Sequence, residues 1–226
     1  MAHRVCFLAQ LNNGPAYREI EVDFQYFSGF SVSQKQKSIK SLHENIRLVN
    51  KDIRVLEVST KSPDPIGVEL SAFNLCFHDK NSGKEYSLEN VFQSSKVFEH
   101  GGPYRDLLEV HPRDAKRDER LKSSGELICF SLNGEDWELE PKSMFYDWIY
   151  MHALLRDSKL ANAILEYNAF TDIEFNHNKS INCQARSAAI FVSLSQRGIL
   201  EKTLKNKEEL RKIYPSAKRG QISIFE

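Results

Sequence analysis

The stretch "YSLENVFQSSKVFEHGGPYRDL" (residues 86–107) combines a helix-forming pattern with a sharp break at Gly-Gly-Pro. On a helix, Glu89, Gln93 and Lys96 fall within one narrow angular band, which His100 extends, while the apolar residues point elsewhere. A carboxylate flanked by an amide and an ammonium group can act as a positioned acid or base. Spacing alone favours the simpler interpretation, which is a polar helix face in contact with water.

The composition indicates one globular domain. The chain has 226 residues, of which 41% are hydrophobic and 11% aromatic, enough for a sizeable core. Its 31 basic residues balance 31 acidic ones, so we expect any contact with nucleic acid to be local. Four scattered cysteines without paired spacing indicate free thiols and neither a disulfide framework nor a zinc site. No apolar run has the length of a signal peptide or a membrane span, so we expect a cytoplasmic protein.

The remaining chain predicts an α+β fold that is mostly helical. Alternating β-forming residues predict strands around the turn "NNGPA", and Asn133-Gly134 predicts the turn of a later hairpin. The charged segment after Gly198 is expected to be peripheral. Strands are expected within residues 4–10, 17–27, 53–60 and 126–140, and helices at about 31–50, 115–123, 142–155, 158–167 and 184–197.

The helix expected at residues 31–50 carries a lysine in line with its apolar stripe. Ile39, Leu42, Ile46 and Val49 recur at the spacing of a buried face, and Lys35 precedes Ile39 by four residues. Burial and the positive end of the helix dipole both disfavour the charged form of an amine there. A neutral amine is what a Schiff-base nucleophile needs. Position alone favours the alternative, in which the side chain lies over apolar surface and reaches water.

Two later segments contain candidate ligand-binding residues. Trp148 belongs to an apolar stripe that predicts core packing, although an indole ring can also stack on a base. No nucleotide-binding, hydrolase or metal-binding motif is present, and no metal site is expected. "FTDIEFNHNKSINCQARSAAIF" (residues 170–191) places polar side chains just before a helix, where free N–H groups favour a phosphate or carboxylate. They are Thr171, Asp172, Glu174, Asn176, Asn178, Lys179, Asn182 and Arg186.

Four motifs in order carry a family resemblance: "LSAFNL" (70–75), "LENVFQSSKVFE" (88–99), Trp148 in a helix, and "FTDIEF" with "NCQARSAA" (170–175, 182–189). They resemble the NADAR superfamily, whose members are small, metal-free, mostly helical N-glycosidases that act on ribosyl phosphates and ADP-ribose conjugates. "GFSVSQKQKSIKSLH" (29–43), "GGPY" and "LKSSGEL" look more narrowly like the NADAR antitoxins paired with DarT-type toxins. Those toxins ADP-ribosylate guanine in DNA.

The resemblance implies a single domain over residues 1–226 with a YbiA-like helical core at about 24–200. A small β-sheet comes largely from the N-terminal part, and the strands of residues 1–30 and the tail of residues 199–226 are expected to be peripheral. The resemblance also implies that no cofactor is needed. The expected partners are ADP-ribosylated DNA and a cognate DarT-type toxin, with no membrane.

The resemblance assigns roles to single residues. The family's glutamate in an E-x-x-x-Q helix corresponds to Glu89, and its late acidic residue corresponds to Asp172, with Glu174 as the near alternative. Where the family has a glycine-rich late loop, this chain reads "IEFNHNKSIN". An arginine that opens the last helix suits a diphosphate through bidentate hydrogen bonds. The expected ligand-binding residues are Asn74, Gln93, Lys96, Trp148, Lys179 and Arg186.

The expected activity is removal of ADP-ribose from guanine bases in DNA, as antitoxin to a DNA ADP-ribosyltransferase toxin. In one route Lys35 attacks C1″ after ring opening, and water hydrolyses the imine while Glu89 moves protons. In the other, Asp172 and Glu89 divide the roles of a two-carboxylate glycosidase. The alternative functions are a metabolic N-glycosidase on a small ribosyl phosphate and a non-catalytic module that binds ADP-ribose or inhibits the toxin.

Overall fold

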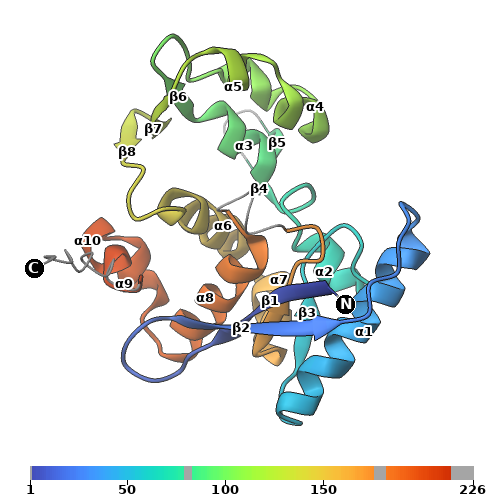
Figure 1. Ribbon diagram of the computed structural model, residues 1–226. Helices are drawn as coiled ribbons and strands as arrows, with labels where there is room; N and C mark the ends of the chain where they lie inside the picture. The colour runs from blue at the N-terminus through green and yellow to red at the C-terminus, as the bar shows by residue number, and fades with distance from the viewer. Residues whose placement is uncertain (1, 79–82, 176–181, 215–226) are drawn as a thin grey trace, which may run out of the picture.

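The computed structural model describes residues 2–78, 83–175 and 182–214 (Figure 1). Its elements confirm an α+β fold that is rich in helix. The strands are β1 (Ala2–Ala9), β2 (Tyr17–Phe24), β3 (Val55–Glu57), β4 (Cys76–His78), β5 (Glu85–Ser87), β6 (Lys96–Phe98), β7 (Leu127–Leu132), β8 (Glu135–Trp137) and β9 (Ala169–Thr171). The helices are α1 (Val32–Val49), α2 (Pro65–Glu69), α3 (Leu88–Ser94), α4 (Pro112–Arg117), α5 (Arg120–Ser123), α6 (Met144–Arg156), α7 (Ser158–Ala163), α8 (Gln184–Gln196), α9 (Leu200–Leu204) and α10 (Lys207–Arg211), with 3₁₀ turns at Arg105–Leu108 and Ile164–Glu166.

The largest sheet has the strand order β2-β1-β9-β3, so the N-terminal strands form half of it, as the sequence predicts. Strand β1 is antiparallel to β2 and β9, whereas β3 runs parallel to β9 and aligns Glu57 with Thr171. Because β1 lies inside this sheet and Phe7 belongs to the main core, the expectation of peripheral N-terminal strands is wrong.

Successive residues of a strand point to opposite faces of the sheet, so a strand with apolar residues at both sets of positions needs cover on both faces. Helices cover both faces of this sheet. Helix α1 covers one face and buries Ile39, Leu42 and Ile46 against a set that includes Cys6 and Val55. Helices α6 and α8 form the core on the other face, together with Phe7, Leu56 and Phe170. Figure 1 shows α1 and α8 on opposite sides of the strands. The sheet therefore separates two apolar cores.

Helix α1 forms as predicted, although its buried stripe is shorter. Ser31 is the N-cap, and its side chain accepts a hydrogen bond from the Gln34 N–H. Lys35 follows in the first turn. Val49 is 66% exposed at the last helical residue, so its predicted burial is wrong. The sheet no longer covers the helix at that point.

A second region of α3, α4, α5 and the sheet β6-β7-β8 lies above α6 in Figure 1. The predicted hairpin turn is confirmed: Asn133 and Gly134 have φ values of 54° and 80°, as a two-residue turn requires. Helix α3 ends at Ser94, so the prediction that Lys96 and His100 extend its polar face is wrong. Lys96 instead begins β6 and pairs with Phe130 of β7.

The segment of residues 199–214 packs into the core, contrary to the expectation of a peripheral tail. Leu200, Leu204 and Leu210 are buried in the main cluster. The Tyr214 hydroxyl donates to Asp147 Oδ2 of α6 at 2.8 Å. Half of the sixteen residues of this segment are charged, which conceals the apolar spacing in the sequence.

Leu42→Ala should lower the free energy of unfolding by about 2–5 kcal/mol, because it leaves a cavity between α1 and the sheet. Val49→Ala, from the same sequence stripe, should change it by less than about 0.5 kcal/mol. Chemical denaturation of both variants tests this. Equal losses would contradict the boundary of the buried face.

Candidate functional site

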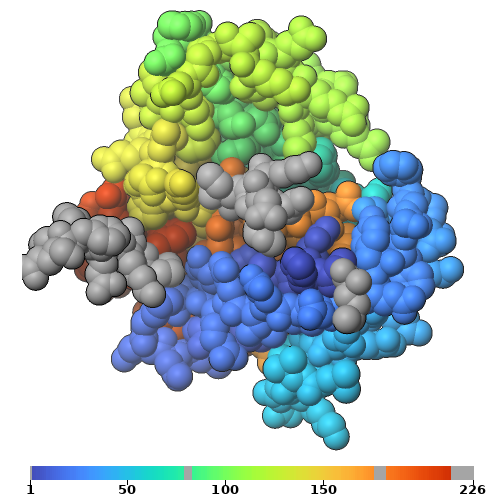
Figure 2. Space-filling view, viewed as in Figure 1, coloured from blue at the N-terminus to red at the C-terminus, as the bar shows by residue number. Residues whose placement is uncertain are grey.

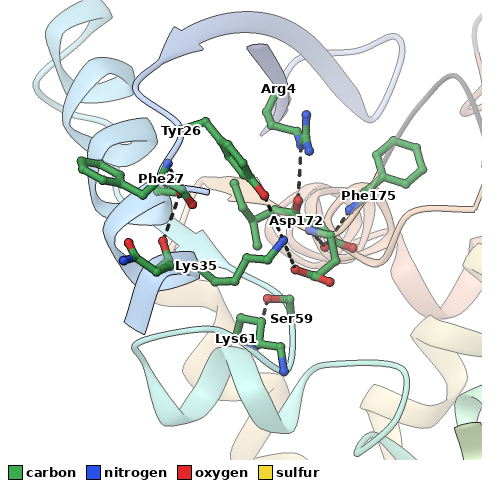
Figure 3. Close-up of polar contacts among 12 residues, drawn as sticks. Arg4, Tyr26, Phe27, Lys35, Ser59, Lys61, Asp172 and Phe175 are labelled. Carbon is green, nitrogen blue, oxygen red and sulfur yellow. Dashed lines mark hydrogen bonds and ion pairs between the residues drawn. The ribbon is translucent and has the colours of Figure 1, made fainter. Parts of the chain in front are cut away.

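Lys35 of α1 lies next to the segment that follows β9, the strand between β1 and β3 in the largest sheet. Its Nζ lies 3.1 Å from Glu174 Oε1 and 3.5 Å from the Tyr26 hydroxyl, and its side chain is 17% exposed. Figure 3 shows Lys35 and Tyr26 pointing into the same space as Asp172. We call Lys35, Tyr26, Glu57, Asp172 and Glu174 the lysine–carboxylate cluster.

The charge on Lys35 differs from the expectation. Burial acts to lower the pKa of Lys35, but the hydrogen bond and negative charge of Glu174, with Tyr26, outweigh burial and raise it. The predicted neutral amine is therefore wrong for the resting protein. The sequence argument counted burial and the helix dipole but had no means of placing a carboxylate at the amine.

Asp172 follows β9 and is held by the turn after it. Its Oδ1 accepts hydrogen bonds from the N–H groups of Glu174 and Phe175, at 3.0 and 3.2 Å. Burial, followed by the negative charge of Glu57, raises the pKa of Asp172 to about 8, although hydrogen bonds from Glu174 N–H and Gln184 oppose the rise. A carboxyl group of this kind keeps a proton near neutral pH and is suited to act as an acid.

Glu57, the last residue of β3, is 1% exposed and lies beside Asp172. Its carboxylate accepts hydrogen bonds from Thr171 Oγ1, Ile173 N and Ser59 Oγ at 2.6–2.8 Å. The sequence interpretation gave Glu57 no role. A carboxylate in the middle of the apolar run "VLEV" (55–58) is the signal that would have pointed to it.

Glu89 and Gln93 line a separate pocket of about 350 Å³ between α3, α4 and α6. Gln93 Nε2 donates to Glu89 Oε1 at 2.8 Å, and Lys116 Nζ lies 3.8 Å from the same oxygen. Glu89 and Gln93 are 4% and 5% exposed, which excludes the solvated helix face. We call this the Glu89 pocket; it is lined by Glu89, Phe92, Gln93, Lys96, Lys116, Leu121, Lys122, Tyr146 and Asn182.

Lys96 is the amine of this pocket whose pKa falls. Burial lowers the pKa of Lys96 to about 8, and the charge of Lys116 adds to this, while Glu89 opposes it. Its Nζ lies 4.9 Å from the centroid of the Phe92 ring. Gln93 Oε1 is buried and has no hydrogen-bond partner among the described residues. The pocket thus presents a cation and an unsatisfied acceptor to a ligand.

Tyr146 connects the Glu89 pocket electrostatically with the lysine–carboxylate cluster. Burial raises the pKa of this phenol, and the negative charges of Glu89 and, to a smaller extent, Asp172 raise it further. Figure 2 shows the green region of α3–α5 and the blue region of β2 and α1 as two separate masses on this face of the molecule. Sequence reasoning missed Tyr146 and Lys116, because it treated both helices as core or solvent-facing.

Two predicted ligand-binding residues lie elsewhere, and a third is not among the described residues. Asn74 Nδ2 donates to Val68 O and faces a different surface cavity. Trp148 Nε1 donates to Leu204 O, and its ring packs on Trp137 and His152, so α6 turns Tyr146 and not Trp148 toward the Glu89 pocket. Lys179 lies outside the described residues.

Arg186 is buried in α8 next to Asp147 of α6. Its Nη2 lies 3.4 Å from Asp147 Oδ2, and the Asp147 carboxylate also accepts from the hydroxyls of Ser143, Ser187 and Tyr214. At 8% exposure, Arg186 joins two helices inside the protein. Its contact with a diphosphate stays a prediction.

The described residues were also searched for other kinds of site. Within those ranges, no group of three or more His, Cys, Asp or Glu side chains could hold a metal ion. None of the helices in the same ranges has both the length and the apolar character needed to cross a membrane. The four cysteines, all within the described residues, are free thiols.

Comparison with known proteins gives a single clear result. No curated protein matches the chain. A family model described as "DarT1-associated NADAR antitoxin" matches residues 2–223. Since that match covers nearly the whole chain, it confirms the resemblance inferred from the four ordered motifs. The chain belongs to the family of DarT1-associated NADAR antitoxins.

Proposed function

We propose that this protein is a glycohydrolase that removes ADP-ribose from guanine bases in DNA and so reverses the modification made by a DarT-type toxin. The observation that carries the proposal is the lysine–carboxylate cluster in a chain of this family: an amine, a proton-bearing carboxyl and a second carboxylate meet at one place. These are the groups that cleavage of a glycosylamine needs.

The proposed reaction begins with Asp172. Its proton passes to the ribose ring oxygen, the ring opens, and a C1″=N double bond forms to the guanine exocyclic nitrogen. Glu174 takes a proton from Lys35, whose neutral amine then adds to C1″. A proton of the attached lysine nitrogen passes to the guanine nitrogen, the C1″–guanine bond breaks, and the base leaves with its amine restored. Water hydrolyses the Lys35 imine, the C4″ hydroxyl closes the ring again, and ADP-ribose and lysine are released; the proton taken up by Glu174 returns to Asp172 through solvent.

Geometry favours this imine route over the two-carboxylate route. Lys35 and Asp172 share one cluster, joined through Glu174, whereas Glu89 is engaged by Gln93 and Lys116 in the neighbouring pocket. The ion pair with Glu174 supplies the base that a protonated Lys35 requires before it can attack.

The Glu89 pocket suits the binding of the conjugate. Lys96 and Lys116 provide positive charge for phosphate oxygens, and the amide of Gln93 provides an acceptor for a hydroxyl group. The zero net charge of the chain fits a protein that recognises the ADP-ribose mark more than the DNA backbone.

Release of ADP-ribose from a DNA oligonucleotide carrying it on guanine is the direct test. The wild-type protein should turn over many times, whereas Lys35→Arg should lose activity by a factor of about 10² or more, because it keeps the positive charge but cannot form an imine. Addition of borohydride during turnover should attach ADP-ribose to the peptide containing Lys35. Lys37→Arg, at an exposed lysine of the same helix, is the matched control and should behave as wild type.

Each contrary outcome has a distinct meaning. Full activity of Lys35→Arg, or no trapped adduct, would contradict the imine route and favour two carboxylates. Activity only on a small ribosyl phosphate would replace the DNA substrate with a metabolite. Stoichiometric protection of DNA without turnover would indicate a binding module.

The rate should depend on pH through Asp172. Because the acid must carry its proton and its pKa is about 8, kcat/KM should fall as the pH rises through that value. Asp172→Asn should lower the rate by about 10²–10⁴-fold at neutral pH. A kcat/KM profile measured from pH 6 to 9.5 tests this, and a flat profile above pH 7 would contradict an acid role for Asp172.

A further inference from the structure

We propose that Glu57 is a positioning residue for the reaction and acts through Asp172, an inference that rests on the proposed function. Glu57 lies at the end of the parallel strand next to β9 and is 1% exposed, so it acts from the interior and not from the surface.

The hydrogen bonds of Glu57 hold the chain on both sides of Asp172. Oε2 accepts from Thr171 Oγ1 at 2.6 Å, and Oε1 accepts from Ile173 N at 2.8 Å. These donors belong to the residues immediately before and after Asp172. The carboxylate therefore fixes the backbone from which the Asp172 side chain projects, and it does so from a separate strand.

A second chain of contacts fixes Thr171 from the opposite side. Burial lowers the pKa of His43 to about 3, so its ring is neutral at physiological pH. Its Nε2 lies 2.9 Å from Thr171 Oγ1. Since Thr171 gives its own hydrogen to Glu57, Nε2 must be the donor to Thr171, which sets the tautomer. His43, Thr171 and Glu57 thus form one ordered line of hydrogen bonds ending beside Asp172.

Burial raises the pKa of Glu57 as well, but the neutral donors Ile173 N, Thr171 and Ser59 oppose the rise and stabilise the negative charge, which acts on Asp172. Both carboxyl groups accept three hydrogen bonds, but those to Glu57 are 2.6–2.8 Å long, whereas the two backbone bonds to Asp172 are 3.0 and 3.2 Å long and the third comes from Gln184. Shorter hydrogen bonds favour the ionised form, so the proton shared by the two buried carboxyls is better placed on Asp172. A neutral side chain at position 57 would fill the same space without burying a charge. The charge thus has a local effect, which is to keep the neighbouring acid protonated.

Other charged or titratable groups face this pair from every element packed around it. Glu174 adds negative charge to Asp172, and Lys35 is engaged by Glu174. Gln184 donates to Asp172, which favours its ionised form. The remaining groups are Arg4 and Cys6 of β1, Tyr26 before α1, His43 of α1, Tyr146 and Tyr150 of α6, and Cys183 before α8.

Glu57→Gln removes the charge and keeps the shape. The amide oxygen, in the place of Oε1, can still accept from Ile173 N and Ser59 Oγ. The amide nitrogen, in the place of Oε2, can donate to Thr171 Oγ1, whose own hydrogen then turns to His43 Nε2 in the other neutral tautomer. The alkaline fall of kcat/KM should move down by about one pH unit, which corresponds to an activity loss of up to about tenfold above pH 8. KM should change by less than about twofold, and the melting temperature should not fall.

Ser59→Ala is the matched control, because it removes one hydrogen bond to Glu57 and no charge; its pH profile should stay in place. Glu57→Asp keeps the charge but shortens the side chain. Its kcat should fall, whereas the alkaline limb of its kcat/KM profile should stay close to that of the wild type. Glu57→Gln with a wild-type profile, or with an equal loss of rate at all pH values, would overturn the proposal. If Glu57→Gln fails to fold, Glu57→Asp provides the test. This variant keeps the charge, so a shift of its alkaline limb to lower pH would overturn the proposal equally.

Direct titration separates this proposal from the proposed function. The carboxyl carbon of Asp172, followed by NMR in wild type and Glu57→Gln, should show a lower pKa in the variant. If wild type releases no ADP-ribose from modified DNA, the proposed function fails while this titration still reports on the pair. If wild type is active and the two pKa values are equal, the role of Glu57 fails alone.

Discussion

The parallel pairing of β3 with β9 is the constraint on which the rest of the site depends. It aligns Glu57 with Thr171 and thereby brings two carboxyl groups, 115 positions apart in the sequence, together in the interior. Parallel strands need a long connection, and here the connection contains the whole region of α3, α4 and α6. The same pairing that creates the buried carboxyl pair also places the Glu89 pocket near it.

The two cores then determine which side chains can reach the site. Helix α1 is fixed by Ile39, Leu42 and Ile46, and one turn earlier Lys35 extends past the edge of the sheet to Glu174. Helix α8 fixes the other face and holds Cys183 and Gln184 beside Asp172. Amine and acid are thus held from opposite faces of one sheet, with Glu174 between them. Rigid helices hold both, which favours accurate geometry.

The sequence predicted most elements because their signals are local. The cap at Ser31, the Asn133-Gly134 turn and the apolar spacing of α1 need only neighbouring residues. Site geometry was harder, since it depends on partners far away in the chain. The amine of Lys35 was expected to be neutral because its ion pair with Glu174 cannot be inferred from the sequence. Trp148 was predicted to contact the ligand, whereas its indole donates to Leu204 O. Family motifs identified Glu89, but not Glu57, whose role depends on a strand pairing.

The position of β1 has a consequence for the order in which the sheet can form during synthesis. Residues 2–9 leave the ribosome first, yet one edge of this strand pairs with residues 169–171, and α6 gains its Tyr214 contact later still. At translation speeds of roughly 5–20 residues per second, β1 waits roughly ten to thirty seconds for that neighbour. Contacts of such long range also slow folding after release. A member of an antitoxin family built in this way completes the sheet around Asp172 only after residues 169–171 have been made, however early its first strand is ready.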